Sequence, residues 1–389
     1  MYSVKTLNKI SKAGLAQFNK DLFTVADDIE NADAYLVRSA NLNDSEIPAS
    51  INCIARAGAG VNNIPIDRCS EQGVVVFNTP GANANAVKEL VIGTMILTSR
   101  NAFTSYDWAK TLKGNGEEVE KLVEKGKSQF VGPEVCGKTL GVIGLGAIGG
   151  LVANSAVSLG MNVIGYDPMM SVDAAWRLSA SVHKATDLDQ VFMNSDYITI
   201  HVPLLPDTKD TICKDSIAKM KDGVIILNFA RGGLVNTADI IEAVESGKVA
   251  KYAADFINDD LLCRKNIIAL PHLGASTPES EENCALMAVR QISDYMLYGK
   301  ITNSVNFPNV DLTDLGGLTR ICVLHKNIPN VISSISSLVA GKGINIDHLV
   351  SRSKKELAYA VLDVVTDPGD EIISSLMDID GVIRVRIIR

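Results

Sequence analysis

The chain has 389 residues, of which 47% are hydrophobic and 21% charged, and this balance is typical of a folded globular protein with two or three domains. Its formal net charge of −8 argues against nucleic acid as a main partner, because a phosphate-binding face needs concentrated Lys and Arg. No apolar run is long enough to span a membrane and the N-terminus lacks a signal-peptide core, so we expect a cytoplasmic protein. The seven cysteines are spaced singly, which predicts reduced thiols and no metal site.

Apolar runs alternate with helical patterns along the first part of the chain. Three short runs, at residues 33–39, 51–58 and 73–80, indicate buried parallel strands. Six further strands are predicted at 138–144, 161–167, 196–203, 223–230, 251–256 and 266–272. Helical patterns separate these strands, so the sequence predicts an α/β fold with two doubly wound parallel sheets.

The last part of the chain changes this pattern. An amphipathic helix at 277–300 is expected to return to the first region, which makes the second region an insertion. Residues 318–389 then show the order strand, helix, strand, strand, helix, strand, which predicts a small βαββαβ module.

A glycine-rich turn follows the predicted strand at 138–144. Gly144, Gly146 and Gly149 have GxGxxG spacing and stand directly before a helix. The first glycine permits a tight turn, the second lets the backbone approach a pyrophosphate, and the third lets the helix pack close to its strand. The helix begins with Ala147 and Ile148, whose amides are expected to face the phosphates.

An acidic residue ends the next predicted strand. Asp167 stands eighteen residues beyond Gly149, at the position where a carboxylate accepts hydrogen bonds from a ribose and repels a 2′-phosphate. The turn, the two strands and this carboxylate together predict a dinucleotide site that favours NAD over NADP.

Charged residues follow three consecutive strands of the second region. Arg231 follows the strand at 223–230, Asp255 ends the next with Asp259 and Asp260 just beyond, and His272 ends the third. Ligands of doubly wound sheets bind outside the carboxyl ends of the strands, so we expect these side chains to meet there.

These residue types suit hydride transfer from a hydroxy acid to a nicotinamide. Arg231 can bind a carboxylate through two hydrogen bonds. His272 can take the hydroxyl proton, since an imidazole has an ordinary pKa near neutrality, and a neighbouring carboxylate favours the protonated ring. A structural histidine is the alternative for His272, and His201 is a competing acid–base candidate that we expect to line the cofactor side instead.

The segments GLGAIG (144–149), NFARGG (228–233) and PHLGAST (271–277), with the acidic stretch between the last two, resemble those of the D-2-hydroxyacid dehydrogenase family over nearly the whole chain. The resemblance implies that Arg231 and His272 are catalytic. The histidine-partnering glutamate of the family falls on Asp260, so this chain has the shorter Asp there, and Asp259 is the alternative partner. Asp255 is expected near the nicotinamide carboxamide.

The resemblance also implies the other ligand-binding residues. Further cofactor contacts are expected from His201, Pro203, Ala230 and Gly274. In the first region, the glycine-rich loop after the strand at 51–58 is expected to offer amides to the substrate carboxylate, from Ala57, Gly58 and Ala59. Arg38 is a candidate clamp for a substrate phosphate, with a salt-bridging surface arginine as the alternative.

The C-terminal module resembles an ACT domain, a small amino-acid-sensing unit. Its His325, Asn327 and Asn345 correspond to residues that hold the effector serine in serine-inhibited relatives, where two such domains pair. Asn330 stands at a position that is often Gly, and Asn also tolerates left-handed backbone. A purely structural, oligomerising module is the alternative.

The predicted domains are a substrate-binding domain (1–97 and 276–305), an NAD-binding Rossmann domain inserted into this flavodoxin-like domain (98–275), and an ACT-like regulatory domain (318–389). The expected activity is NAD-dependent oxidation of 3-phosphoglycerate to 3-phosphohydroxypyruvate, the first step of L-serine synthesis, in a homo-oligomer that serine inhibits. The alternatives are a hydroxypyruvate or 2-oxoglutarate reductase of the same family and a non-catalytic NADH-sensing regulator. No metal, nucleic-acid or membrane partner is expected.

Overall fold

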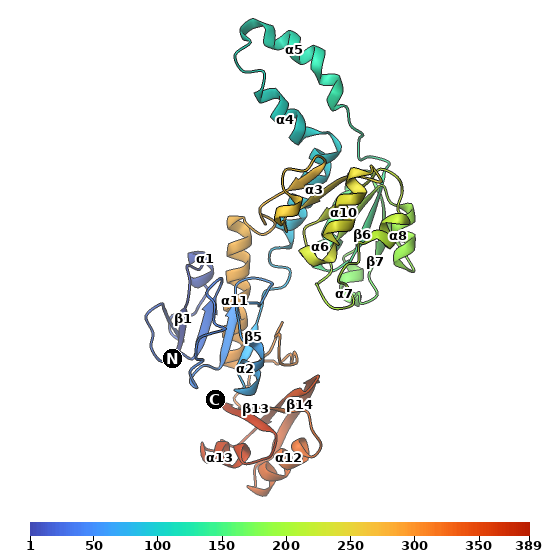
Figure 1. The fold of residues 1–389 in the computed structure, drawn as a ribbon. Helices are drawn as coiled ribbons and strands as arrows, with labels where there is room; N and C mark the ends of the chain where they lie inside the picture. Colours follow the sequence, from blue (N-terminus) through green and yellow to red (C-terminus); the bar gives the residue numbers. More distant parts are fainter. The chain divides into compact units, whose positions relative to one another are not determined.

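The computed structural model describes residues 1–389, which form two compact units. One unit consists of Met1–Asn83 and Pro278–Arg389, and the other of Ala84–Thr277 (Figure 1). No helix combines the length and the apolar character that crossing a membrane requires.

The first unit contains a five-stranded parallel sheet. Its strands are β1 (Tyr2–Thr6), β2 (Phe23–Ala26), β3 (Ala34–Val37), β4 (Cys53–Arg56) and β5 (Val75–Phe77), in the order β2-β1-β3-β4-β5. Short helices α1 (Lys12–Leu15) and α2 (Ile66–Glu71) lie between strands. This is the flavodoxin-like order, which confirms the predicted fold. The strands β1 and β2 escaped the sequence analysis because their side chains are mostly half-buried and show no clear apolar run.

The long helix α11 (Pro278–Tyr298) returns to this sheet. Ala285, Ala288, Val289 and Ile292 are buried on it and belong to the same apolar core as the strand residues. The chain therefore leaves the first unit after Asn83 and re-enters it at Pro278.

A four-stranded antiparallel sheet follows in the same unit. Its strands are β13 (Thr319–Lys326), β14 (Ile346–Lys354), β15 (Leu357–Val364) and β16 (Val382–Ile388), in the order β14-β15-β13-β16. Helices α12 (Val331–Gly341) and α13 (Glu371–Met377) pack on it through apolar residues, which completes the predicted βαββαβ order.

Two arginines join this C-terminal module to the end of α11. Arg386 lies with its guanidinium 4.6 Å from the centre of the Tyr295 ring and donates to the carbonyl oxygens of Tyr295 and Met296. Arg320 donates to the carbonyl oxygen of Tyr298 and forms a buried, two-pronged ion pair with Asp363 at 2.6 and 2.8 Å. Cations here satisfy the free carbonyls of a helix C-terminus, so the module caps α11.

The second unit is built on a seven-stranded parallel sheet. Its strands are β6 (Thr139–Ile143), β7 (Asn162–Tyr166), β8 (Val182–Lys184), β9 (Tyr197–Ile200), β10 (Val224–Asn228), β11 (Val249–Ala254) and β12 (Ile267–Ala269), in the order β12-β11-β10-β9-β6-β7-β8. The order reverses between β6 and β9, as in the Rossmann fold that the sequence predicted. The additional strand, β8, has only three residues, two of them exposed, and this left no pattern to detect.

The second unit also contains eight helices longer than a single 3-10 turn. They are α6 (Ala147–Ser158), α7 (Val172–Trp176), α8 (Leu188–Asn194), α9 (Lys214–Ala218) and α10 (Thr237–Glu245), with α3 (Ala84–Ser99), α4 (Ala102–Lys110) and α5 (Val119–Gly126) before β6. Asn236 caps the N-terminus of α10, because its side chain accepts a hydrogen bond from the amide of Asp239.

The helix α3 differs from the predicted division of the chain. The sequence led us to expect the boundary after residue 97, but the units divide before Ala84. The reason is packing: Val87, Val91 and Met95 of α3 belong to the same apolar core as the strands of the second unit.

Candidate active site

The glycine-rich turn between β6 and α6 has the geometry of a phosphate site. Gly144 has φ +89°, a conformation that L side chains rarely adopt. A Cβ added to Gly149 would lie 1.8 Å from the carbonyl oxygen of Gly144, so only glycine permits this packing. Around Gly146, at the N-cap of α6, no atom lies within 4 Å of an added Cβ, and this open space faces the helix N-terminus. The residues present therefore fit the pyrophosphate of a dinucleotide.

Asp167 lies beside this turn. It follows β7, and its carboxylate accepts hydrogen bonds from the amides of Leu145 and Met169, both at 2.9 Å. The first bond ties the acidic side chain to the glycine turn itself. A ribose attached to a pyrophosphate bound at that turn would meet this carboxylate.

His201 lies on the other side of the turn, at the end of β9. Its Nε2 lies 2.9 Å from the Thr199 hydroxyl, while its Nδ1 is buried without a partner. Burial lowers the pKa of His201 from an ordinary 6.5 to about 4. The ring is therefore neutral near pH 7 and supports the turn, since its backbone packs against Gly144. Pro203 follows it on the exposed loop after β9.

Arg231 stands on a turn that Asn228 shapes. The Asn228 side chain, at the end of β10, donates to the carbonyl oxygen of Arg231 at 2.9 Å and accepts from the amide of Ala230 at 3.2 Å. The guanidinium is exposed, and its Nη1 donates to the Ala230 carbonyl oxygen at 2.6 Å. The side chain is thus free to receive a carboxylate.

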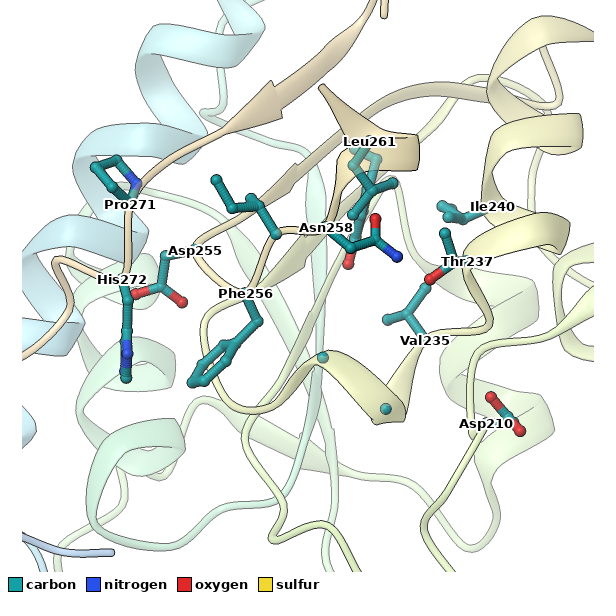
Figure 2. A pocket seen from close by; sticks show the side chains of 14 residues that line it. Asp210, Val235, Thr237, Ile240, Asp255, Phe256, Asn258, Leu261, Pro271 and His272 are labelled. Carbon is teal, nitrogen blue, oxygen red and sulfur yellow. The ribbon is translucent and has the colours of Figure 1, made fainter. Parts of the chain in front are cut away.

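Asp255 and His272 meet at the neighbouring strand ends. The amide of His272 donates to the carbonyl oxygen of Asp255 at 3.0 Å, and the Asp255 carboxylate accepts from the amide of Gly274 at 3.1 Å. His272 is exposed and has φ +30°, which is strained for a residue with a side chain; such strain is common at active sites. Figure 2 shows Asp255, Phe256 and His272 together at one end of a cavity.

The cavity has a volume of about 830 Å³. Its walls come from the turn after Arg231, the start of α10, and the segment from β11 to β12 (Figure 2). The Phe256 ring lies 4.4 Å from the His272 ring and 5.5 Å from the Arg231 guanidinium, measured from the ring centre in both cases. The predicted cation and imidazole are therefore brought together.

The electrostatics of Asp255 couple it to both groups. Only 2% of this residue is exposed, and one carboxylate oxygen has no partner. Burial raises the pKa of Asp255, while the Gly274 amide and the charges of His272 and Arg231 oppose this rise. Asp255 is thus the carboxylate that lies beside His272.

Asp260 lies elsewhere, in contrast to the expectation from the family resemblance. Together with Asp259 it belongs to a short 3-10 turn (Asp259–Leu261) whose buried residue is Leu261. With Leu261 turned inward, Asp260 faces a second cavity that is lined by α10 and includes Glu242 and Glu245. No ion pair connects Asp260 or Asp259 with His272 in this structure.

The predicted substrate loop of the first unit follows β4. Ala57 and Gly58 already donate their amides to the carbonyl oxygens of Val37 and Arg56, both at 2.8 Å. Of the three predicted donors, Ala59 alone keeps an amide without an internal acceptor. Its carbonyl oxygen accepts from the Asn78 side chain at 2.6 Å, which holds the loop in place.

Arg38 stands directly after β3 in the same unit. Its Nη2 lies 2.7 Å from a carboxylate oxygen of Glu281 in the first turn of α11. Both side chains are about two-fifths exposed, at 41% and 44%. Arg38 is therefore accessible to an anion, but a protein carboxylate occupies its guanidinium.

The predicted effector residues lie around the start of the C-terminal module. His325 is buried, with Nδ1 2.7 Å from the carbonyl oxygen of Lys326 and Nε2 without a partner. The Asn327 side chain donates to the carbonyl oxygen of Lys355, and Asn345 is exposed just before β14. Asn330 has φ +70°, in agreement with the predicted tolerance of left-handed backbone.

Sequence reasoning missed two residues of these sites. Phe256 gave no signal because an aromatic after an apolar strand is ordinary core composition, although it directly follows Asp255. Glu281 lies in a run of acidic residues at a helix start, where stabilisation of the helix dipole is sufficient explanation.

Comparison with known proteins agrees with this geometry. Residues 92–274 match the family described as D-isomer specific 2-hydroxyacid dehydrogenase, NAD binding domain. The chain is 40% identical over 68% of its length to a hydroxypyruvate reductase of Thermotoga maritima, covering 85% of that protein. It is 35% identical over 79% of its length to a D-3-phosphoglycerate dehydrogenase of Methanocaldococcus jannaschii, of which it spans 58%.

A solved structure extends the comparison to the fold. The NAD⁺-bound 3-phosphoglycerate dehydrogenase of Entamoeba histolytica is 25% identical and superposes with a TM-score of 0.59, over 78% of this chain and 98% of that one. With the glycine turn, Asp167 and the Arg231–His272 pair in place, this chain belongs to the D-isomer-specific 2-hydroxyacid dehydrogenase family, and its second unit contains the NAD-binding domain.

Proposed function

We propose that this protein oxidises 3-phosphoglycerate to 3-phosphohydroxypyruvate with NAD, as a D-3-phosphoglycerate dehydrogenase. One observation supports this most: Arg231, Asp255 and His272 lie at adjacent strand ends beside a cavity, in a domain with a complete dinucleotide turn. A guanidinium, a carboxylate and an imidazole are the groups that oxidation of a 2-hydroxy acid requires.

The proposed mechanism assigns one task to each side chain. Arg231 binds the substrate carboxylate and orients the neighbouring carbon. His272 takes the hydroxyl proton as the carbonyl forms, and Asp255 stabilises the resulting imidazolium through its charge. Held at the glycine turn and Asp167, NAD would supply the hydride acceptor for the carbon that carries the hydroxyl group.

Substrate selection is the less direct part of the proposal. Arg38 is the proposed contact for the phosphate and the amide of Ala59 for the carboxylate end. The names of two relatives, from M. jannaschii and E. histolytica, support 3-phosphoglycerate. The T. maritima relative supports a second candidate, reduction of hydroxypyruvate, which lacks a phosphate.

Regulation by serine is proposed for the C-terminal module. The unpartnered, buried Nε2 of His325 supports a polar ligand there, with Asn327 and Asn345 as further contacts. Capping of α11 by Arg320 and Arg386 would connect this module to the substrate sheet.

We further propose a homo-oligomer in the cytoplasm. The helices α4 and α5 project as a hairpin from the second unit (Figure 1), and no side chain in residues 101–139 is buried. Tyr106 and Val131 are 68% and 80% exposed in this segment. A helical hairpin without a buried side chain lacks a core of its own, which supports packing against a second copy.

A substrate panel tests these proposals. The protein is assayed with NAD and 3-phosphoglycerate, glycerate, lactate or 2-hydroxyglutarate, each with and without L-serine. We expect 3-phosphoglycerate to give the highest kcat/KM and serine to reduce it. Higher kcat/KM for glycerate would favour the hydroxypyruvate reductase, and NADH binding without any turnover would favour the NADH sensor.

His272→Ala tests the chemistry. We expect kcat to fall by at least about a hundredfold while NADH affinity stays nearly unchanged, because the histidine moves a proton and does not hold the cofactor. Equal loss of both would indicate a structural histidine.

A further inference from the structure

The Phe256 ring is the contact that Arg231 and His272 share. Its centre lies 5.5 Å from the Arg231 guanidinium and 4.4 Å from the centre of the His272 ring, with the two rings tilted by 45°. Neither the Arg231 guanidinium nor the His272 imidazole forms a hydrogen bond or ion pair with another side chain. Phe256 thus contacts both side chains directly, whereas Asp255 interacts with both through its charge.

The backbone presents this ring at a defined place. Phe256 directly follows Asp255, whose carbonyl oxygen and carboxylate are bonded to the segment that contains His272. On the other side, a Cβ added to Gly232 would lie 3.5 Å from the Phe256 Cβ, at van der Waals distance, so the turn after Arg231 packs closely against Phe256. The ring is half-buried and lines the same cavity as His272 (Figure 2).

The chemistry of the ring suits a positioning residue. The face of an aromatic ring attracts a guanidinium, and ring pairs prefer tilted contacts to a flat sandwich. A phenyl group has no hydrogen-bonding atom, so it competes neither for the substrate carboxylate nor for the proton. Its two side-chain torsions also make it stiffer than a long aliphatic chain.

We infer that Phe256 is a positioning residue that holds Arg231 and His272 at the spacing needed for a 2-hydroxy or 2-oxo acid, and that its aromatic character is required. This inference rests on the proposed function of the same site. It assigns Phe256 no contact with the reacting atoms. A leucine of similar bulk would fill the space but would lose the attraction for the guanidinium and the imidazole.

The test compares Phe256→Leu and Phe256→Tyr with Leu262→Ala, a control at a nearby exposed apolar residue that lines neither cavity. We expect Phe256→Leu to lower kcat/KM for 3-phosphoglycerate about tenfold, with a raised KM from the loosened Arg231 and a reduced kcat from His272. The pH profile of kcat/KM should also shift. Phe256→Tyr and Leu262→Ala should stay within about twofold of the natural protein.

A binding measurement separates this inference from the proposed reaction. Oxalate, a planar dicarboxylate, is titrated calorimetrically into the NADH-bound protein, and we expect Phe256→Leu to bind it about tenfold more weakly. A second outcome is that the natural protein oxidises 3-phosphoglycerate and binds oxalate while Phe256→Leu does both equally well and differs only in a lower Tm. In that case the inference about Phe256 is wrong and the proposed function stands. If the natural protein neither oxidises 3-phosphoglycerate nor binds oxalate, the inference about Phe256 and the proposed function are both wrong.

Discussion

The backbone amide of His272 donates a hydrogen bond to the carbonyl oxygen of Asp255 across 3.0 Å, and this bond connects the ends of the paired strands β11 and β12. The His272 imidazole therefore interacts with the charge of the Asp255 carboxylate, whereas the Asp260 carboxylate faces α10. The family resemblance alone would have assigned the histidine partner to Asp260.

This relationship predicts different effects for the two aspartates. We expect Asp255→Asn to lower kcat at least about a hundredfold, because the buried charge that stabilises the imidazolium is lost. Asp260→Asn should change kcat less than about threefold. Steady-state kinetics with 3-phosphoglycerate measure both, and the opposite order would restore the assignment from the resemblance.

Two glycines of the phosphate turn provide a matched pair. In Gly149→Ala the new Cβ meets the Gly144 carbonyl oxygen, so we expect both lower stability, by about 1 to 3 kcal/mol, and weaker NADH binding. In Gly146→Ala the Cβ enters open space, so stability should change by less than about 1 kcal/mol while NADH affinity falls. Thermal unfolding and NADH titration distinguish the two, and unchanged affinity in Gly146→Ala would contradict a pyrophosphate there.

The preference for NAD should depend on Asp167. In Asp167→Asn the side chain keeps its shape and one of the two oxygens that accept from the amides of Leu145 and Met169. The substitution removes the negative charge that repels a 2′-phosphate. We expect the ratio of kcat/KM with NAD to that with NADP to fall about tenfold. A ratio equal to that of the natural protein would show that Asp167 only supports the turn.

Glu281 is expected to weaken substrate binding. A substrate phosphate must displace its carboxylate from Arg38, and an exposed ion pair of this kind contributes about 0 to 1 kcal/mol. Glu281→Gln should therefore lower the KM for 3-phosphoglycerate up to about fivefold, with kcat unchanged. The control is Glu282→Gln at the next, also exposed, residue. Equal KM values in the two variants would argue against Arg38 as the phosphate contact.

Burial of His201 predicts a loss of stability in acid. Its pKa is about 4 in the folded protein and 6.5 ordinarily, so between these values the unfolded chain binds a proton that the folded chain does not. The free energy of unfolding should fall as the pH drops from 6.5 to 4, by about 3 kcal/mol in total for this group, with its full contribution present above 6.5. Urea unfolding at pH 7.5 and about pH 5 measures this, and His201→Gln should show a smaller difference. If the free energy of unfolding changed equally between the two pH values in the natural protein and in His201→Gln, His201 would be accessible to protons in the folded protein.

The sequence by itself determined the features that depend only on residues close to one another along the chain. The dinucleotide turn needs six consecutive residues and a following helix, so Gly144, Gly146 and Gly149 identify it without tertiary information. The apolar strands of the second unit, such as β9 and β10, are buried on both faces and were therefore easy to predict. Strands with mixed exposure, such as β1, β2 and β8, were not predicted.

The tertiary structure alone decided which side chains face one another. No local pattern shows which of Asp255, Asp259 and Asp260 lies beside His272. In the folded chain, Leu261 is buried and Asp260 faces α10, while hydrogen bonds tie Asp255 to the segment that contains His272. The contacts of Phe256 with Arg231 and His272, and of Arg38 with Glu281, join residues from separate elements. Such contacts arise from how strands and helices pack, and local propensity contains no information about packing partners.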